Sequence, residues 1–328
     1  MQRREFITLL GSAAAWPLAA HAQQPERMRR IGIIVAASPD DASFQTWIGV
    51  FLQALGQLGW SIGRNVRIDT HWATTKAATI RRHATELAAL APDVILTAGT
   101  STTGPMLEAT RTVPIVFATI VDPVGSGFID SLARPGGNAT GFLLFEYSLG
   151  GKWLELLKQI APTVTRVAVL RDAATPSGTG QFGAIQAVAP SLNVDVVPVN
   201  MRDDADFERT IAAFARSPNG GLILTGSGRS ILHRDLIIAL AARHKLPAIY
   251  FEKFFVTAGG LISYGSDRIE LYRLAAGYVD RVLRGEKPAD LPVQAPTKFE
   301  LAIDLKTAKA LDLTVPPSLL ASANEVIE

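Results

Sequence analysis

The sequence predicts an α/β protein of two lobes, each with a parallel sheet covered by helices on both faces. Three observations support this prediction. Short apolar runs that suit buried strands alternate with segments of helical periodicity along most of the chain. The chain has 328 residues, enough for about two domains, and 48% of them are hydrophobic, enough for sizeable cores. The alternation pauses at the turn cluster Pro135-Gly136-Gly137-Asn138 and then starts again.

The first half opens with an apolar run at Arg30–Ala36 that suits a buried strand. Ala42–Leu58 follows with apolar residues at helical spacing, and Gly59 closes it. We expect three more strands and two helices after it: strands at Val66–His71, Val94–Thr97 and Ile115–Ala118, and helices at Thr75–Leu90 and Ser101–Thr110. Thr140–Phe145 is short and extended, and we interpret it as a crossing between the lobes.

The second half repeats this alternation. We expect strands at Val167–Arg171, Asp195–Pro198, Gly221–Thr225 and Ala248–Tyr250, and helices at Leu149–Ile160, Gln181–Ala189, Asp204–Ala215 and Ile231–Arg243. A long amphipathic helix, Asp267–Arg284, comes next, followed by the strand Phe299–Asp304 and the helix Leu305–Leu311. Open parallel sheets bind ligands at the carboxyl ends of their strands, so two facing sheets would line one cleft. Hinge closure around a ligand is expected for such a pair.

Residues 1–22 have the three parts of an export signal: the charged start Arg3-Arg4-Glu5-Phe6-Ile7, an apolar centre and the small-residue end Ala20-His21-Ala22. The apolar centre is shorter than the ~20 residues needed to span a bilayer. We therefore expect a cleaved signal peptide and a periplasmic protein. The paired arginines favour the twin-arginine route, but Gln2 and Thr8 depart from its usual flanks, so general secretion stays open.

Composition excludes several classes of function. The net charge is +2 without a concentrated Lys/Arg stripe, so nucleic-acid binding is not favoured. Cysteine is absent, which excludes disulfides, thiolate metal sites and cysteine nucleophiles. None of the histidines shows close metal-ligand spacing, so we predict no metal site. These histidines are His21, His71, His83, His233 and His244.

No motif predicts an enzyme or a cofactor. Gly59-Trp60-Ser61-Ile62-Gly63 matches the nucleophile-elbow pattern, but it follows a helix and precedes a strand, which is the reverse of the elbow. Gly226-Ser227-Gly228-Arg229-Ser230 lacks the third glycine of a dinucleotide fingerprint. An exported α/β hydrolase remains an alternative, which an ester or phosphate screen would separate from a binding protein.

Two strand-end loops suggest contacts with a ligand. Gly99-Thr100-Ser101 follows a strand and opens a helix, where free N–H groups and the helix dipole attract anions. Thr100 or Ser101 is a plausible N-cap, and capping alone or capping with contact to a ligand carboxylate both stay open. Asp122 follows another strand, where its carboxylate could hold a ligand ammonium group or cap the next turn.

The second half offers further candidates at strand ends. Thr225, Ser227 or Arg229 could contact a small ligand or form a plain turn. The aromatic candidates for a cleft wall are Tyr250, Phe251 and Tyr264, because they border strand ends. The tryptophans Trp47, Trp60, Trp72 and Trp153 fit core or surface packing better than a ligand cage.

Short segments spread over the whole chain carry a family resemblance. They are Arg30-Ile31-Gly32-Ile33-Ile34, Leu58–Val66, Pro114–Ala118, Asp122-Pro123-Val124, Arg134–Gly141, Ala258–Gly265, Leu283–Val293 and Ala308–Leu311. In these segments the chain resembles ABC transporter substrate-binding proteins, in the branch that includes tryptophan-type uptake binding proteins. The first loop, Ala37-Ser38-Pro39-Asp40, departs from the His-Pro or similar pattern often seen in relatives, and Leu311-Asp312-Leu313 has Asp where relatives commonly carry Gly.

The resemblance implies the periplasmic binding protein type I fold, with two Rossmann-like lobes joined by a three-strand hinge. By analogy, lobe 1 is 29–144 with 267–291, and lobe 2 is 145–266 with 292–328. The implied ligand contacts lie in the cleft loops: Ser38, Gly99, Thr100, Ser101, Asp122, Arg171, Thr225, Ser227, Tyr250 and Glu252.

The resemblance also implies a function. The chain would be a monomeric solute receptor that binds a small organic molecule, such as an amino acid or aromatic carboxylate, and delivers it to an ABC permease in the inner membrane. It would bind no nucleic acid, metal or cofactor. A sensor component that binds the same ligands but docks on a signalling receptor is a further alternative.

Overall fold

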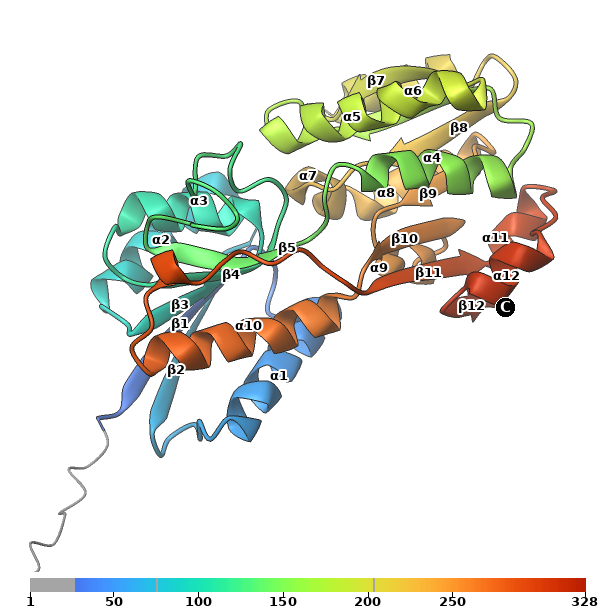
Figure 1. Ribbon diagram of the computed structural model, residues 1–328. Helices are drawn as coiled ribbons and strands as arrows, with labels where there is room; N and C mark the ends of the chain where they lie inside the picture. The colour runs from blue at the N-terminus through green and yellow to red at the C-terminus, as the bar shows by residue number, and fades with distance from the viewer. Residues whose placement is uncertain (1–26, 75, 203) are drawn as a thin grey trace, which may run out of the picture.

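The structure, a computed structural model, describes residues 27–74, 76–202 and 204–328. The predicted export signal, residues 1–22, lies outside the described residues. The strands form one five-stranded sheet and one seven-stranded sheet, and Figure 1 shows the two sheets in separate lobes joined by thin crossing segments. We name them the five-stranded lobe and the seven-stranded lobe. This arrangement confirms the predicted fold class of two α/β lobes.

The five-stranded lobe has a wholly parallel sheet in the order β2-β1-β3-β4-β5. Its strands are β1 (Arg29–Val35), β2 (Val66–Trp72), β3 (Val94–Thr97), β4 (Ile115–Ile120) and β5 (Ala139–Leu143). The helices α1 (Ala42–Gln57) and α10 (Arg268–Leu283) pack together, as do α2 (Ala77–Ala89) and α3 (Thr100–Ala109). The two pairs cover opposite faces of the sheet (Figure 1). The chain reverses its strand order between β1 and β3, which is where doubly wound sheets bind ligands.

The segment predicted as a crossing, Thr140–Phe145, is mainly the edge strand β5 of this sheet. Gly141 makes the pairing possible, because a Cβ atom there would lie 2.0 Å from the Phe117 carbonyl oxygen of β4. Its φ of 150° also lies where side chains are rarely tolerated. The first crossing therefore begins only after Leu143.

The seven-stranded lobe has the sheet order β12-β11-β10-β9-β8-β6-β7. Its strands are β6 (Arg166–Arg171), β7 (Asp195–Asn200), β8 (Gly220–Leu224), β9 (Ala248–Tyr250), β10 (Ile262–Ser266), β11 (Phe299–Asp304) and β12 (Glu325–Ile327). All neighbours pair in parallel except β10 and β11. The prediction of purely parallel sheets is wrong at this pair. The chain leaves β10 for the other lobe and returns at the same end, so β11 must run in the opposite direction.

Helices cover this second sheet as well. They are α4 (Leu149–Ile160), α5 (Pro176–Val188), α6 (Asp204–Phe214), α7 (Gly228–Leu232), α8 (Arg234–Arg243), α9 (Lys253–Thr257), α11 (Leu305–Ala310) and α12 (Pro317–Ser322), with a 3-10 turn at Ala189–Leu192. Another 3-10 turn, Pro288–Asp290, contacts β5 of the five-stranded lobe. The helix predicted at Ile231–Arg243 is two helices that meet at His233. Helix α5 begins five residues before the predicted start, because Thr175 caps it and Pro176 occupies its first turn.

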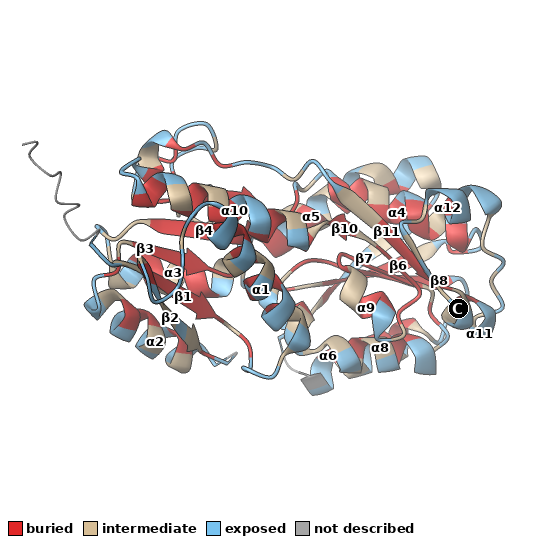
Figure 2. Ribbon diagram, turned by 90° about the horizontal axis from the view of Figure 1, so that it is seen from below, coloured by how far each residue is buried: buried red, intermediate tan, exposed pale blue. Residues whose placement is uncertain are grey.

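The hydrophobic core runs from one lobe into the other. One cluster of buried residues includes Trp47 and Tyr272 from the five-stranded lobe and Phe251 and Phe255 from the seven-stranded lobe. Figure 2 shows buried residues in both sheets and exposed residues on the outer helix faces. Three segments cross between the lobes, at 144–148, at Asp267 and at 291–298. Among the helices in the described ranges, none has both the length and the apolar content to cross a membrane.

Candidate ligand-binding site

The predicted contact residues lie at two sheet edges that face one another. In the five-stranded lobe they follow β1, β3 and β4, and in the seven-stranded lobe they end or follow β6, β8 and β9. These strands are neighbours within their sheets. The carboxyl ends of parallel neighbours share one edge, and each edge includes the point where the strand order reverses. The topology therefore brings the predicted loops together, and contacts across the lobes show how closely they meet.

Helix α3 presents an uncapped N-terminus at the first edge. Its N-cap is Gly99, with φ of 86° and no side-chain hydrogen bond to the helix. The expectation that Thr100 or Ser101 caps this helix is wrong, because the left-handed turn at Gly99 makes them the first two helical residues. Of the other helices that follow the strand ends of the site, α1, α5 and α7 are capped by Asp41, Thr175 and Ser227, whereas α9 also lacks a side-chain cap. The first N–H groups of α3 thus lack a side-chain acceptor and carry the positive end of the helix dipole.

The opposite lobe closes over this helix start. Ser101 is exposed, and its Oγ atom lies 3.9 Å from the position that a Cβ atom on Gly228 would occupy. Gly228 begins α7, and Ser227 caps that helix by accepting a hydrogen bond from the Ser230 backbone N–H at 3.1 Å. Two strand-end turns, one from each lobe, therefore face each other at the points where both sheets reverse their order.

The turn after β8 is held rigidly from behind. The buried Gln181 side chain accepts from the Gly226 N–H at 2.8 Å and donates to the Gly226 carbonyl at 3.2 Å. Thr225 is fully buried, and its hydroxyl donates to the Leu170 carbonyl at 2.8 Å. Thr225 thus stabilises the sheet and does not face the cleft. Gln181 was not predicted, and no sequence pattern marks it.

At the end of β6, the charged residue that faces the β8 turn is Asp172. Arg171 donates to Asn200 at 3.0 Å, and its guanidinium group lies 4.9 Å from the ring centroid of Phe182. Arg171 therefore points toward β7, away from β8. The next residue, Asp172, is largely buried and forms an ion pair of 3.7 Å with Arg229 of the β8–α7 turn.

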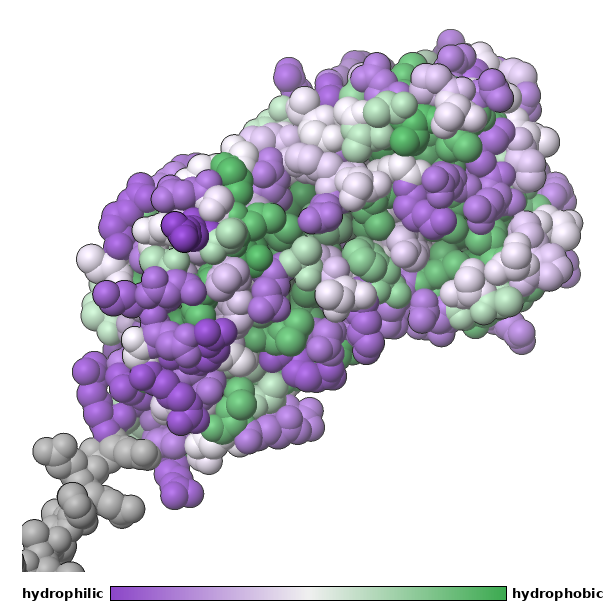
Figure 3. All heavy atoms as spheres, in the orientation of Figure 1, coloured by the Kyte–Doolittle hydropathy of each residue, from purple (hydrophilic) through white to green (hydrophobic). Residues whose placement is uncertain are grey.

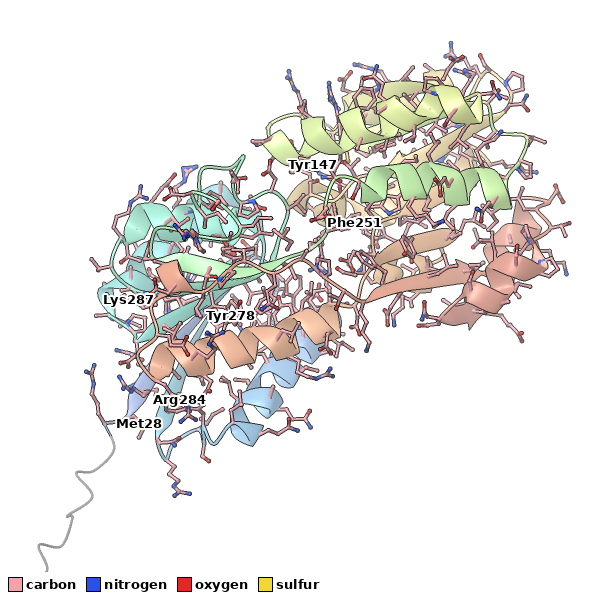
Figure 4. All side chains as sticks on the ribbon, viewed as in Figure 1. Met28, Tyr147, Phe251, Tyr278, Arg284 and Lys287 are labelled. Atoms are coloured by element: carbon pink, nitrogen blue, oxygen red, sulfur yellow. The ribbon has the colours of Figure 1, made fainter. Side chains whose placement is uncertain are left out.

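Asp122 connects the first edge to the crossing segment. Its Oδ1 accepts from the Gly125 N–H at 2.7 Å, and its Oδ2 accepts from the Tyr147 hydroxyl at 2.5 Å. The Tyr147 ring lies against α5, since a Cβ atom on Gly180 would come within 2.4 Å of it. Figure 4 shows Tyr147 between the lobes, near one end of α5. Burial, aided by the Asp122 carboxylate, raises the pKa of Tyr147, so its hydroxyl stays protonated and keeps donating.

A pocket of about 240 Å³ lies where α1, α9 and the start of α10 meet. Its buried charge pair is Arg268 with Glu252, at 2.5 Å. The Arg268 guanidinium lies 4.7 Å from the ring centroid of Trp47, and Trp47 stacks on Tyr272 at 6.0 Å. Burial raises the pKa of Glu252 against the opposing effect of Arg268. Two buried hydroxyls, Ser266 Oγ and Tyr272 Oη, lack a hydrogen-bond partner among the described residues.

Aromatic residues reach this pocket from both lobes. Trp47 lies 6.3 Å from Phe254 of α9, measured between ring centroids. Tyr250 is buried in the core and stacks on Phe255 at 5.1 Å, so its ring does not line the cleft. Phe251 is likewise buried, whereas Tyr264 lines a separate pocket of about 330 Å³ beside the crossing segments. Figure 3 shows hydrophobic residues reaching the surface in this middle region between the lobes. Ser38 is exposed in the loop after β1.

Comparison with known proteins identifies the family. A family model described as ABC transporter substrate binding protein matches residues 30–327. The chain belongs to this family. Its members are binding proteins and not enzymes; they bind small molecules, work with ABC transporter permeases and are typically exported or extracellular.

Individual relatives agree with this assignment. A tyrosine-binding protein of Clostridioides difficile is 26% identical over 269 residues, covering 80% of this chain and 75% of the relative. The structure of an ABC domain from Streptococcus pneumoniae in complex with L-Trp has a TM-score of 0.84 at 23% identity, over 92% of this chain and 100% of that one. A ligand-free, open substrate-binding protein from Clostridium difficile has a TM-score of 0.71 at 23% identity, over 92% and 99% of the two chains. These structures share the fold of this chain.

Proposed function

We propose that this ABC transporter substrate-binding protein binds an amino acid or aromatic carboxylate between the two strand-end edges. The observation that carries the proposal is the uncapped N-terminus of α3, which faces the Ser227–Gly228 turn of the other lobe. Free N–H groups at the positive end of a helix bind carboxylates without a positively charged side chain. The tyrosine-binding relative favours an aromatic amino acid as the ligand.

The apolar part of the ligand lies against the aromatic residues of the 240 Å³ pocket at α1, α9 and α10. Trp47 and Phe254 come from opposite lobes, so one ring placed at their junction contacts both. A buried hydroxyl without a partner costs about 1–3 kcal/mol. The Ser266 and Tyr272 hydroxyls are therefore positions where a bound polar group adds stability.

The proposed contact set differs from the one expected from sequence. Ser38, Gly99, Thr100, Ser101, Asp122, Ser227 and Glu252 remain in it, because their loops meet at the facing edges. Thr225, Tyr250 and Arg171 leave it, since their side chains are engaged elsewhere in the seven-stranded lobe. Asp172, Arg229, Trp47 and Arg268 join it.

The same proposal includes the protein's cellular context. Residues 1–22 direct export and are cleaved after Ala22, and the mature chain acts in the periplasm as a monomer without nucleic-acid partners. It delivers its ligand to an inner-membrane permease. We take residues 29–144 and 267–291 as lobe 1 and residues 145–266 and 292–328 as lobe 2. The packing of α10 against α1, β3 and β4 supports the assignment of α10 to lobe 1.

A ligand screen by thermal denaturation tests the proposal. The screen contains L-Trp, L-Tyr, L-Phe, 3-phenylpropionate, benzoate, uridine and ribose. A ligand at 100 times its Kd adds about 2.7 kcal/mol to the stability of the folded state, which raises the Tm by roughly 5–10 °C. We expect such a rise for at least one aromatic carboxylate and 1:1 binding in calorimetry. Stabilisation by uridine or ribose alone would refute the carboxylate assignment.

A further inference from the structure

The five-stranded lobe has a second polar cluster, separate from the strand-end loops. Strand β2 supplies His71, and helix α2 supplies His83 and Glu86. The Nδ1 atoms of the two histidines are 3.0 Å apart. The Glu86 Oε2 atom lies 3.4 Å from His83 Nδ1 and 3.8 Å from His71 Nδ1. Both imidazoles are partly buried, and Glu86 is half exposed.

These separations fit a single metal ion. Three atoms at 3.0, 3.4 and 3.8 Å from one another are all about 2.0 Å from a common point in their plane. An ion slightly out of that plane lies about 2.1 Å from each, which matches the Zn–N and Zn–O distances of about 2.0–2.2 Å in tetrahedral sites. A fourth position of the tetrahedron is then open to a water molecule.

The local structure holds the three groups in place. Helix α2 packs on the sheet through Ile80, Ala84 and Leu87, which fixes His83 and Glu86 on the flank beside β2. The other Glu86 oxygen, Oε1, lies 3.7 Å from Arg82 Nε, so Oε2 is the oxygen that faces the histidines. The imidazole planes are inclined at 82°, so the rings meet edge to face and do not stack.

We propose that His71, His83 and Glu86 bind one Zn²⁺ ion. Two imidazoles and a carboxylate with a free fourth position are a ligand set that zinc accepts. The ion would join β2 to α2 and would stabilise the five-stranded lobe independently of the ligand-binding site. Sequence spacing did not predict a metal site, because the two histidines are 12 residues apart and come from different elements.

Calorimetry on an untagged mature chain, residues 23–328, tests the proposal with ZnCl₂ as the titrant and no organic ligand present. We expect 1:1 binding, a rise in Tm with Zn²⁺, and the visible absorption of tetrahedral Co²⁺ when cobalt replaces zinc. His71→Gln and His83→Gln should each weaken Zn²⁺ binding at least about 10-fold, since residues that only support a metal ligand already contribute about 10- to 100-fold. His244→Gln is the matched control, because His244 ends α8 in the other lobe, and it should leave Zn²⁺ binding unchanged.

Each outcome decides the question. Absence of 1:1 binding, or binding that survives both His71→Gln and His83→Gln, would overturn the site and leave an imidazole–imidazole hydrogen bond at 3.0 Å. If a histidine variant fails to fold, Glu86→Gln replaces it, because Glu86 is half exposed, and this variant should lose the Co²⁺ spectrum. The zinc readouts are independent of the aromatic ligand screen, so failure of one proposal leaves the other intact.

Discussion

The buried pair Arg268–Glu252 offers the sharpest test of how the lobes are joined. Arg268 starts α10 directly after the second crossing, whereas Glu252 belongs to the seven-stranded lobe. Their side chains are only 6% and 5% exposed. Arg268→Met keeps much of the side-chain volume over Trp47 but removes the positive charge. The variant therefore leaves the Glu252 carboxylate buried without its partner.

The size of the effect follows from burial. Removing one partner of a buried ion pair costs about 3–5 kcal/mol, because the remaining charge is desolvated and uncompensated. A chain of this size loses about 2–4 °C of Tm for each kcal/mol, so the Tm of Arg268→Met should fall by roughly 10 °C at pH 8. Differential scanning calorimetry of the ligand-free protein measures this change.

The fall in Tm of Arg268→Met should depend on pH, and the environment of Glu252 determines whether it grows or shrinks as the pH rises. Burial already raises the pKa of Glu252 above the ordinary value of a glutamate, and loss of Arg268 removes the main opposing effect. A carboxyl group whose pKa is higher in the folded protein than in the unfolded chain takes up a proton on folding. Its contribution to the free energy of unfolding is therefore lost as the pH rises through the pKa of the folded state. The fall in Tm caused by Arg268→Met should therefore be small near pH 4.5 and should reach its full size at pH 8.

A double variant provides the control. Arg268→Met with Glu252→Gln removes both charges, so its difference from the wild-type Tm should vary much less with pH. A Tm of Arg268→Met within about 2 °C of the wild type at pH 8 would refute the reasoning. An equal deficit at both pH values would show that packing over Trp47, and not the unpaired carboxylate, causes the loss.

Three further predictions concern the cleft and the sheet. Asp122→Asn keeps the turn at φ of 52° but removes the charge, so calorimetry should show at least tenfold weaker binding of amino acids, given about 1.5–3 kcal/mol for a charged hydrogen bond. Binding of 3-phenylpropionate should weaken less, because that ligand is affected only through the contact between Asp122 and the Tyr147 hydroxyl. Equal loss for both ligands would contradict a contact with the ligand ammonium group. Thr100→Val should lower ligand affinity without changing the Tm. Thr210→Val, at an exposed position of α6, should change neither the affinity nor the Tm. Gly141→Ala should lower the Tm by several degrees, because its Cβ atom would collide with the Phe117 carbonyl oxygen. A Tm equal to that of the wild type would show that β5 can shift away from β4.

Elements with a strong local signal were predicted well. The strands Val94–Thr97 and Ala248–Tyr250 were placed without error, because burial on both faces of a sheet favours short apolar runs. The helix Leu149–Ile160 was also placed without error, because its apolar residues recur at helical spacing. Strand β10 was missed, since Ile262–Ser266 mixes apolar residues with Ser and Gly and has no clear period. Its place in the sheet depends on pairing with β9 and β11, which are distant in sequence.

The loops of the site were predicted better than its side chains. Alternation of strands and helices fixes which loops lie at the carboxyl edge, so the turns after β3 and β8 were located from sequence alone. The direction of each side chain depends on its position in the alternation along the strand and on its contacts with other helices and strands. Arg171 and Asp172 are adjacent and point to opposite neighbours, and Trp47 meets Arg268 only through the packing of α1 on α10.

Contacts between the lobes bear directly on affinity. Ser101 approaches Gly228, Trp47 approaches Phe254, and the Tyr147 hydroxyl binds Asp122, so the facing edges are close together in this structure. A ligand that contacts both edges stabilises this closed arrangement by its differential affinity for it. The apparent Kd then equals the intrinsic Kd divided by the population of the closed state. We therefore expect substitution of Tyr147, which removes a contact between the lobes, to weaken binding of every ligand by the same factor in calorimetry.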